Sequence, residues 1–537
     1  MMKKKLISMM LVTCMLLGSM VGCGSKDTGK EGSNEKVTLT VGLPQNVSVS
    51  DYEDNALTKY IEESLNMDLE FQFFASSSSE YAQQLALICS SNEELPDVLW
   101  GFTGLGRKTM NQYGEDGYFV DLTELIEKHA PNYKAKLKTV SDEVRKNIIS
   151  RGTNANTGEF YAMPTYTTSN VADYMQNMMY INQTWLDAVG MTAPTNVDEL
   201  YNVLKAFKTQ DPNGNGEADE IPMLSTGVWL YVINAFVHFS QSDMYNATDG
   251  KVWSPVVTDE YRQAMIYLNK LTSEGLLSDL SFTATNADLK NLISGTEDVS
   301  KVGIWCGHPL TWTTTTAEVL DEYTGLNPLN DATGLGGYGV RQPNYQVYGG
   351  FITKDCENQE AAMRFLDFFY EDETAIRLRH GEKGVDWEEG SGTSAYGTES
   401  IIQVINGQAY FEGNSTWGTT GTTWMTPENN LAIAEKGMGR NAECSRLAAE
   451  SMEIMLNFRR PEEVVVNLIY TDSEETTKEK LEGTFGSYVK ESLTLFACGE
   501  KNPNSDSDWK EYLDTLEQCG LSDLLKVYQS AYTATYK

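Results

Sequence analysis

The sequence VTLTVGLP (Val37–Pro44) opens a regular alternation of predicted strands and helices. A helix, a strand, a second helix and a short buried strand follow it at Ala56–Leu65, Asp68–Phe74, Glu80–Ser90 and Leu95–Trp100. Strands that alternate with helices in this way are typical of parallel sheets covered by helices. The sequence therefore predicts an α/β fold class.

A later helix has a recognisable start and a recognisable buried face. Thr195 and Asp198 are spaced as in a capping box, which predicts that the helix begins there. Apolar residues then recur at the spacing of one helix face, at Leu200, Val203, Leu204 and Phe207.

The first residues predict export. MMKKK is followed by an apolar run from Leu6 to Val21 and then by Gly22 and Cys23, the pattern of a secretory signal. Glycine before cysteine makes this segment look like a bacterial lipoprotein signal, in which the cysteine is lipidated. The alternative is an ordinary N-terminal membrane helix, but the run has about 16 residues and a span needs roughly 20. We expect a signal peptide at 1–22, lipidation of Cys23 and a flexible polar tether at 23–36.

The charge of the mature chain is strongly negative. Removing 22 residues and three lysines leaves 515 residues with 38 basic and 76 acidic side chains, a net charge of −38. This balance argues against nucleic acid as a partner and against a chain lying flat on anionic lipid. It also disfavours a polyanionic ligand, unless a local basic patch overrides it. The length predicts at least two domains.

The cysteines form no recognisable framework. They lie at 14, 23, 89, 306, 356, 444, 498 and 519, without a C-x-x-C pair. We expect no zinc site and interpret the six outside the signal and anchor as buried small hydrophobes. One or two disulfides remain possible.

Several segments resemble a known family in the same order along the chain. They are ELPDVLWGF, GYFVDLTELIEKHAPN, WLDAVGMTAPTNVDELYNVLKAFKTQDPNGNGEADEIP, YGGFITKDCENQEAAMRFLDFFY and the tail DWKEYLDTLEQCGLSDLLKVYQSAYTATY. From about Val37 to its end the chain resembles the extracellular solute-binding lipoproteins of ABC importers, in the long oligosaccharide-binding branch of Gram-positive bacteria.

The resemblance implies a two-lobe periplasmic-binding-protein fold of class II type, with an interlobe cleft and hinge crossovers. The first lobe is expected at 37–165 and 346–395, and the second at 166–345 and 396–537. Hinges are expected at or just before Met178–Asn182 and near Gly336–Gly350. The implied partners are an oligosaccharide and the subunits of an ABC permease, and we expect a monomer.

The stretch DPNGNGEADEIP (Asp211–Pro222) begins like an EF-hand calcium loop. Oxygen-bearing side chains fall at its first, third, fifth and ninth positions with glycine at the sixth, but Pro222 replaces the twelfth-position Glu. An Asx-turn without metal is the alternative. The resemblance implies a structural calcium ion held by side chains and by one backbone carbonyl, that of Glu217. The side chains are those of Asp211, Asn213, Asn215, Asp219 and Glu220.

Aromatic side chains are the expected sugar contacts, because sugar rings present apolar faces. By strand position and by resemblance the candidates are Trp100, Tyr166, Trp229, Trp305 and Trp312. For each of them core packing is the alternative. Asp51 and Asn55 are candidates to bond sugar hydroxyls, or else they cap the helix that follows. Trp185 and Trp509 are expected to be structural.

The catalytic motifs considered are incomplete or absent in this sequence. GFTGLGRKT (Gly101–Thr109) has one residue too many for a phosphate loop, two S-x-x-K matches lack their companion motifs, and H-E-x-x-H is absent. The family resemblance implies a non-enzymatic receptor anchored by lipid on the extracellular face of the membrane, which captures an oligosaccharide for import. An anchored glycoside hydrolase, which needs only two carboxylates, and capture of a peptide or another solute are the alternatives.

Overall fold

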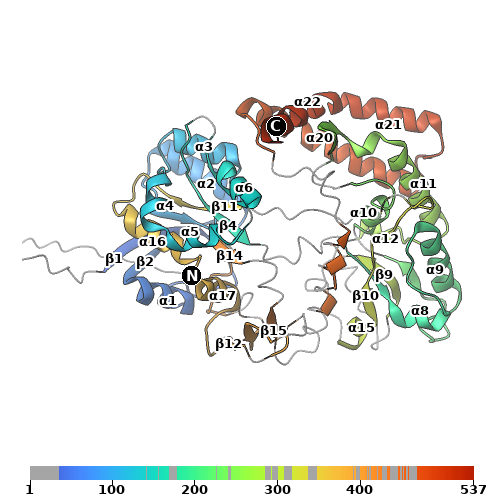
Figure 1. The fold of residues 1–537 in the computed structure, drawn as a ribbon, viewed down its shortest axis with the longest axis horizontal. Coiled ribbons are helices and arrows are strands. Elements are labelled where there is room, and N and C mark those ends of the chain that lie inside the picture. The colour runs from blue at the N-terminus through green and yellow to red at the C-terminus, as the bar shows by residue number, and fades with distance from the viewer. Residues whose placement is uncertain are drawn as a thin grey trace, which may run out of the picture. The chain divides into compact units, whose positions relative to one another are not determined.

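Two main β-sheets, each with its own helices, organise the computed structural model (Figure 1). The structure describes residues 36–140, 142–154, 157–167, 178–224, 227–239, 244–284, 292, 300–306, 317–334, 336, 347–390, 392–394, 399–407, 409, 413–419, 421–425, 432–435, 446–447, 450–451, 453–454, 457–458 and 468–536. The predicted signal peptide and Cys23 lie outside these ranges. No helix within them is long and apolar enough to cross a bilayer.

The first sheet has six strands in the order β14-β4-β11-β3-β1-β2. Their bounds are β1 (Val37–Pro44), β2 (Met67–Phe74), β3 (Val98–Trp100), β4 (Met163–Thr167), β11 (Val347–Ile352) and β14 (Thr423–Met425). β1 is parallel to β2 and β3, as the strand and helix alternation predicts, whereas β11 runs antiparallel between β3 and β4. The six strands and their helices are called the first lobe below.

The helices of the first lobe pack on both faces of this sheet. They are α1 (Ala56–Leu65), α2 (Ser78–Ser91), α3 (Arg107–Glu115), α4 (Thr123–His129), α5 (Pro131–Leu137), α6 (Asp142–Gly152), α16 (Gln359–Phe368) and α17 (Asp372–His380). α16 contacts β1, β11, α1, α4 and α5. Its buried neighbours form one apolar cluster with Trp100, while Leu99 faces a second cluster, because successive strand residues point to opposite faces.

The second sheet has four strands in the order β10-β5-β9-β6. Their bounds are β5 (Met179–Asn182), β6 (Ile221–Met223), β9 (Val302–Cys306) and β10 (Tyr323–Gly325), and a hairpin pairs β7 (Asn246–Thr248) with β8 (Lys251–Trp253). The helices of this second lobe are α8 (Gln183–Val189), α9 (Val197–Thr209), α10 (Val228–Ile233), η1 (Pro255–Val257), α11 (Asp259–Ser273), α12 (Leu280–Thr283), α15 (Ala317–Asp321), α20 (Asp472–Ala497), α21 (Asp506–Gln518) and α22 (Leu521–Tyr536).

The lobe boundaries differ from the expected ones at one end. β14 pairs with β4 in the first sheet, so the return of the chain to the first lobe extends past 395, where the sequence placed its end. A small sheet of β12 (Trp387–Glu389), β13 (Ile402–Val404) and β15 (Ile433–Glu435) lies in the same stretch of sequence. One hinge was expected at or just before Met178–Asn182. Met179–Asn182 is the interior strand β5 of the second sheet, so the position just before it stays the prediction.

The start of α9 corrects the predicted capping box. The N-cap is Asn196, whose side chain accepts from the backbone N–H of Glu199, and not Thr195. The carboxylate of Glu199, one residue beyond Asp198, accepts from both the backbone and the hydroxyl of Thr195. The predicted apolar face is correct, because its four residues are all buried.

Within the described residues no disulfide links Cys89, Cys306, Cys356, Cys498 and Cys519. The first three are buried, as expected of small hydrophobes, whereas Cys498 is exposed.

Candidate functional site

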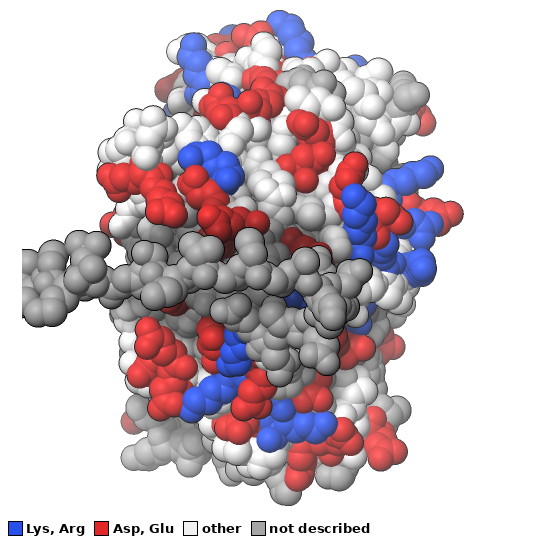
Figure 2. All heavy atoms as spheres, turned by 90° about the vertical axis from the view of Figure 1, so that its left-hand side faces the viewer, with Lys and Arg blue, Asp and Glu red and all other residues white. Residues whose placement is uncertain are grey.

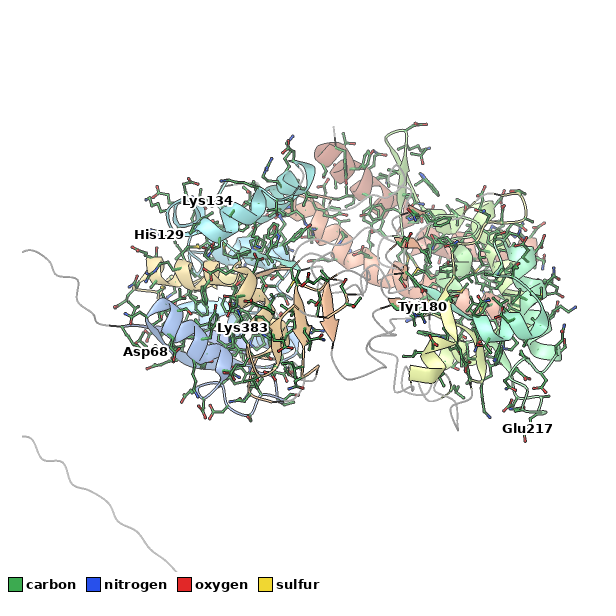
Figure 3. The ribbon with its side chains drawn as sticks, turned by 60° about the horizontal axis from the view of Figure 1, so that its bottom comes forward. Asp68, His129, Lys134, Tyr180, Glu217 and Lys383 are labelled. Atoms are coloured by element: carbon green, nitrogen blue, oxygen red, sulfur yellow. The ribbon has the colours of Figure 1, made fainter. Side chains whose placement is uncertain are left out.

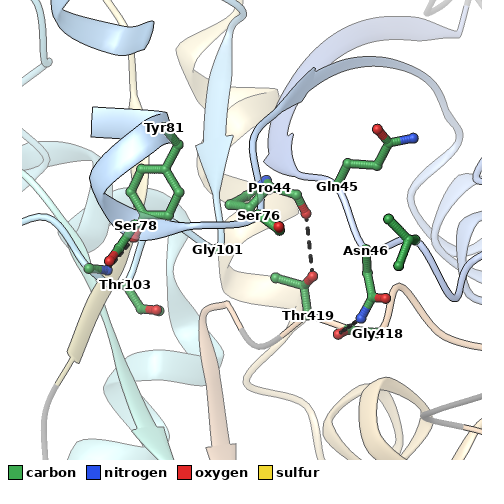
Figure 4. A pocket seen from close by; sticks show the side chains of 12 residues that line it. Pro44, Gln45, Asn46, Ser76, Ser78, Tyr81, Gly101, Thr103, Gly418 and Thr419 are labelled. Carbon is green, nitrogen blue, oxygen red and sulfur yellow. Dashed lines mark hydrogen bonds between the residues drawn. The ribbon is translucent and has the colours of Figure 1, made fainter. Parts of the chain in front are cut away.

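A pocket of about 660 Å³ lies where β1, β2 and β3 end. Because these strands are parallel, their carboxyl ends meet at one edge of the sheet, the edge at which open α/β sheets bind ligands. The lining residues are Pro44, Gln45, Asn46, Val47, Ser76, Ser78, Tyr81, Gly101, Thr103, Gly104, Gly418 and Thr419 (Figure 4). All of them belong to the first lobe.

The loop after β3 is held in place by hydrogen bonds on two sides. The N–H of Gly101 donates to the carbonyl of Gly349 at 2.8 Å, which ties the loop to β11. The N–H of Gly104 donates to the hydroxyl of Tyr81 at 2.6 Å. Burial raises the pKa of Tyr81, so the phenol stays protonated near neutral pH. Hydrogen bonds within the first lobe therefore fix this wall of the pocket.

Asn46 joins the loop after β1 to a distant part of the chain. Its side-chain amide donates to the carbonyl of Gly418 at 2.6 Å, and its backbone N–H donates to the hydroxyl of Tyr52 at 2.8 Å. The Tyr52 hydroxyl in turn donates to the carbonyl of Trp417 at 3.3 Å. Trp417 is buried, and its ring N–H donates to Thr58 on α1 at 2.9 Å. Gly418 and Thr419 reach the pocket because Trp417 anchors them to α1.

The pocket carries no formal charge on its described lining residues. Their polar groups are amides, hydroxyls and backbone groups, and Tyr81 is the one ionisable side chain among them. Such a lining suits a ligand that donates and accepts neutral hydrogen bonds.

The aromatic residues predicted as ligand contacts in the first lobe are packed inside it. Trp100 is fully buried, its ring lies 5.0 Å from those of Phe369 and Trp417, and its ring N–H donates to Thr422. Tyr166 stacks on Trp424 at 4.2 Å and is 6% exposed. These surroundings correspond to the core-packing alternative for both residues.

In the second lobe Trp229 and Trp305 belong to one apolar cluster. Trp305 is fully buried, its ring lies 4.5 Å from Tyr180, and its ring N–H has no hydrogen-bond partner among the described residues. Trp229, on α10, is 7% exposed. Trp312 lies outside the described residues. Trp185 and Trp509 are buried, as expected of structural residues.

Asp51 and Asn55 organise the start of α1. Asn55 is buried and caps α1 through the N–H of Leu57, and its amide also donates to the carbonyl of Thr416 at 2.8 Å. Asp51 is exposed and accepts from the two N–H groups of residues 53 and 54. Neither residue lines the pocket, and both have the capping or turn role that was the alternative.

The predicted calcium loop connects α9 to β6 and projects from the second lobe, as the position of Glu217 in Figure 3 shows. The oxygens of Asp211, Asn213 and Asn215 each accept a local backbone N–H, from Gly216, Asn215 and Glu217. These are the contacts of the Asx-turn alternative. The side chains of both asparagines also donate to one oxygen of Asp219, at 3.2 and 3.1 Å.

The donor set nevertheless fits a hard cation. One oxygen of Glu220 is buried without a hydrogen-bond partner among the described residues, and burial, then the nearby Asp211 and Asp219 carboxylates, raise the pKa of Glu220. The ammonium of Lys301 lies 2.5 Å from Asp219 and partly offsets the negative charge of these carboxylates. No three His, Cys, Asp or Glu side chains in the described part of the chain are placed to hold a metal by themselves. A cation here would therefore also need the asparagine and backbone oxygens.

The sequence missed every polar residue of the pocket. The loops after β1 and β2 carried a usable signal, because polar residues directly follow predicted strands there. Ser76 and Ser78 in particular belong to the serine run Ser76–Ser79, which follows β2. Gly418 and Thr419 carried no local signal, because they follow no strand of the parallel set.

Two lobes built on separate sheets, one with a polar pocket at its strand ends, define a solute-binding protein of the periplasmic-binding-protein type. The chain belongs to the bacterial extracellular solute-binding protein family, whose model matches residues 50–376.

Relatives and solved structures agree with this assignment. The fructooligosaccharide ABC transporter substrate-binding protein FusA of Streptococcus pneumoniae serotype 4 (strain ATCC BAA-334 / TIGR4) is 24% identical over 96% of each chain. Lipoprotein LipO of Bacillus subtilis (strain 168) is 25% identical over 72% of this chain and 74% of its own. An extracellular solute-binding protein from Bifidobacterium longum subsp. infantis superposes with a TM-score of 0.74, at 22% identity over 95% of this chain and 100% of that one.

Two further similar structures are described by an EF-hand or by calcium. An EF-hand mutant of S. pneumoniae FusA in complex with fructo-nystose has a TM-score of 0.67, at 20% identity over 93% of this chain and 99% of that one. Alginate-binding protein AlgQ2 without calcium ion has a TM-score of 0.65, at 19% identity over the same shares. At these identities the likeness concerns the fold.

Proposed function

We propose that this protein is a lipid-anchored extracellular receptor that captures an oligosaccharide and delivers it to an ABC permease. The observation that carries the proposal is the uncharged, hydroxyl- and amide-lined pocket at the strand ends of the first lobe. Sugars offer many hydroxyl groups to such a lining, and the fold and family are those of solute-binding proteins. Closure of the two lobes about a hinge would complete the site.

The proposed ligand contacts in the first lobe are pocket side chains rather than the buried tryptophans. They are Gln45, Asn46, Ser76, Ser78, Thr103 and Thr419. Trp229 and Trp312 remain candidates for the contribution of the second lobe.

The proposal includes the anchor. Lipidation at Cys23 would hold the mature chain on the outer face of the membrane, with 23–36 as its tether. A relative is named as a lipoprotein, which supports this part of the proposal. The expected monomer and the permease contacts belong to the same proposal.

The proposal also includes a structural calcium ion in the Asp211–Glu220 loop. The unpartnered buried oxygen of Glu220 and the converging carboxylates of Asp211 and Asp219 support it. When bound, the ion would neutralise these carboxylates and fix the connection between α9 and β6. The loop that would hold the ion belongs to the second lobe, whereas the pocket belongs to the first. The ion would therefore stabilise the fold rather than contact the ligand.

The test is a panel of oligosaccharides titrated against the mature chain, with tryptophan emission as the readout. A receptor binds at least one member saturably and releases it intact, so prolonged incubation yields no new reducing ends. New reducing ends, removed by substituting a single acidic residue, would instead establish the glycoside hydrolase alternative. Saturable binding of peptides but of no sugar would instead establish a receptor that captures peptides.

A further inference from the structure

Four side chains of the pocket keep hydrogen-bonding groups that no described residue satisfies: Gln45, Ser76, Ser78 and Thr103. One is a primary amide and three are hydroxyls, and each can both donate and accept. They follow the ends of β1, β2 and β3, with Ser78 at the start of α2, so three separate segments of the chain contribute them (Figure 4). This arrangement matches a ligand whose own groups are hydroxyls.

An anionic sugar would find no counter-charge among the described residues that line the pocket. Proteins bind carboxylates tightly through Arg, Lys or several convergent N–H groups, because a carboxylate removed from water without them is strongly destabilised. The described lining contains no Arg, Lys or His. Two of its backbone N–H groups, those of Asn46 and Gly104, already donate to tyrosine hydroxyls.

The net charge of the whole chain also disfavours an anionic ligand. The formal net charge is −35 at pH 7. On the described part of the face shown in Figure 2, basic side chains are interspersed with acidic ones and form no continuous basic surface. A polyanion would therefore meet repulsion over long range and no compensating charge from the described lining of the pocket.

We propose that this pocket selects neutral oligosaccharides and rejects chains of uronic acids. The inference rests on the proposed function of oligosaccharide capture and narrows its ligand to one chemical class. The discriminating groups are the amide of Gln45 and the hydroxyl of Thr103, together with the two serines. Neutral hydrogen bonds, and not ion pairs, provide the recognition.

The experiment compares matched probes on the mature full chain by calorimetric titration. The neutral probes are fructo-, gluco- and xylo-oligosaccharides of three to five units, and the acidic probes are oligogalacturonates and alginate oligomers of equal length. At least one neutral probe is expected to bind, with a Kd that changes less than twofold between about 0.05 and 0.5 M NaCl. The acidic probes are expected to bind at least 100-fold more weakly.

A pair of variants assigns the binding to this pocket. Gln45→Ala and Thr103→Ala are expected to weaken binding of the neutral probe by about 2- to 10-fold each, the effect of losing one neutral hydrogen bond. Gln83→Ala is the matched control, because Gln83 is an exposed glutamine on α2 that does not line the pocket.

The possible failures are distinguishable. If uronate oligomers bind and neutral ones do not, the inference is overturned while oligosaccharide capture stands. If a neutral probe binds but Gln45→Ala and Thr103→Ala behave like Gln83→Ala, selection by this pocket is overturned. If no saccharide of either kind binds, the proposed function fails together with the inference.

Discussion

The side-chain amide of Asn46 donates a 2.6 Å hydrogen bond to the carbonyl of Gly418, which lies 372 residues further along the chain. This bond connects two walls of the pocket. Gly418 has a φ of +58°, and a Cβ atom there would lie 2.6 Å from the amide nitrogen of Asn46. The residue is therefore restricted both by its backbone conformation and by its neighbour.

Gly418→Ala should weaken ligand binding and lower stability. The left-handed conformation costs a non-glycine residue about 1–2 kcal/mol, and the new methyl group displaces Asn46 from the pocket wall. Gly158→Ala is the control, because Gly158 has a φ of +79° with open space around it. Denaturant unfolding should show a loss in both variants, while titration with ligand should show weaker binding in Gly418→Ala alone. Equal ligand affinities in the two variants would contradict a role for the Asn46 contact.

Trp100→Ala should destabilise the first lobe rather than remove a sugar contact. Trp100 is fully buried against Phe369 and Trp417, and truncating such a residue typically costs about 3–5 kcal/mol. Urea unfolding measures the loss. A variant of unchanged stability with much weaker sugar binding would restore Trp100 as a ligand contact.

Asp367 should give the stability a characteristic pH dependence. It accepts from the N–H groups of Tyr133 and Asn132 at 2.8 and 3.0 Å, so it caps α5 from α16. Burial nevertheless raises the pKa of Asp367. Because the folded-state pKa exceeds the unfolded value, the folded protein binds the proton more tightly. The contribution of Asp367 to stability is therefore greatest below the unfolded pKa and declines as pH rises through the folded pKa.

The measurement compares wild type with Asp367→Asn, which cannot ionise. The stability of wild type relative to this variant should increase as the pH falls from neutral into the acidic range. The exposed Asp116→Asn controls for the change in overall charge. A difference between wild type and Asp367→Asn that stays constant with pH would rule out a raised pKa at this site.

Calcium removal should lower the melting temperature. An ion that binds only the folded loop stabilises by mass action, about 2.7 kcal/mol at 100 times its Kd. Asp211→Ala should abolish the response to chelator while the fold survives. Asp514→Ala, on the exposed surface of α21, should keep the response. If metal-free wild type melts at the same temperature as calcium-loaded protein, the loop is an Asx-turn alone.

Cys23→Ser should release the protein into the medium, because the lipidated residue is lost while the signal remains. Cell fractionation with immunodetection measures the distribution. A variant that stays with membranes as firmly as wild type would indicate an uncleaved N-terminal helix instead.

The local elements were predictable from the sequence. β1, α1, β2 and α2 lie within two residues of their predicted bounds, because hydrophobic periodicity and capping residues act over one or two turns. Family membership was also predictable, since it depends on contiguous motifs. The N-cap of α9 was misplaced by one residue because Thr195, Asn196, Asp198 and Glu199 offer two overlapping capping patterns.

Long-range pairing was decided only by the tertiary structure. β11 inserts antiparallel between β3 and β4, and β14 pairs with β4, Met425 with Thr167, although the two strands lie far apart in the sequence. Nothing in the local pattern of a three-residue strand specifies its partner, because the hydrogen bonds that fix it belong to another part of the chain.

The position of Trp100 also depended partly on the sequence and partly on the tertiary structure. The sequence determined that Trp100 ends a buried strand, and therefore that it lies near the ligand edge of the sheet. Only the tertiary structure decided that its ring faces Phe369 and Trp417, because those residues supply the apolar surface that removes it from water. Trp417 also carries Gly418 and Thr419 to the strand ends, so a packing contact made far along the chain completes the polar site.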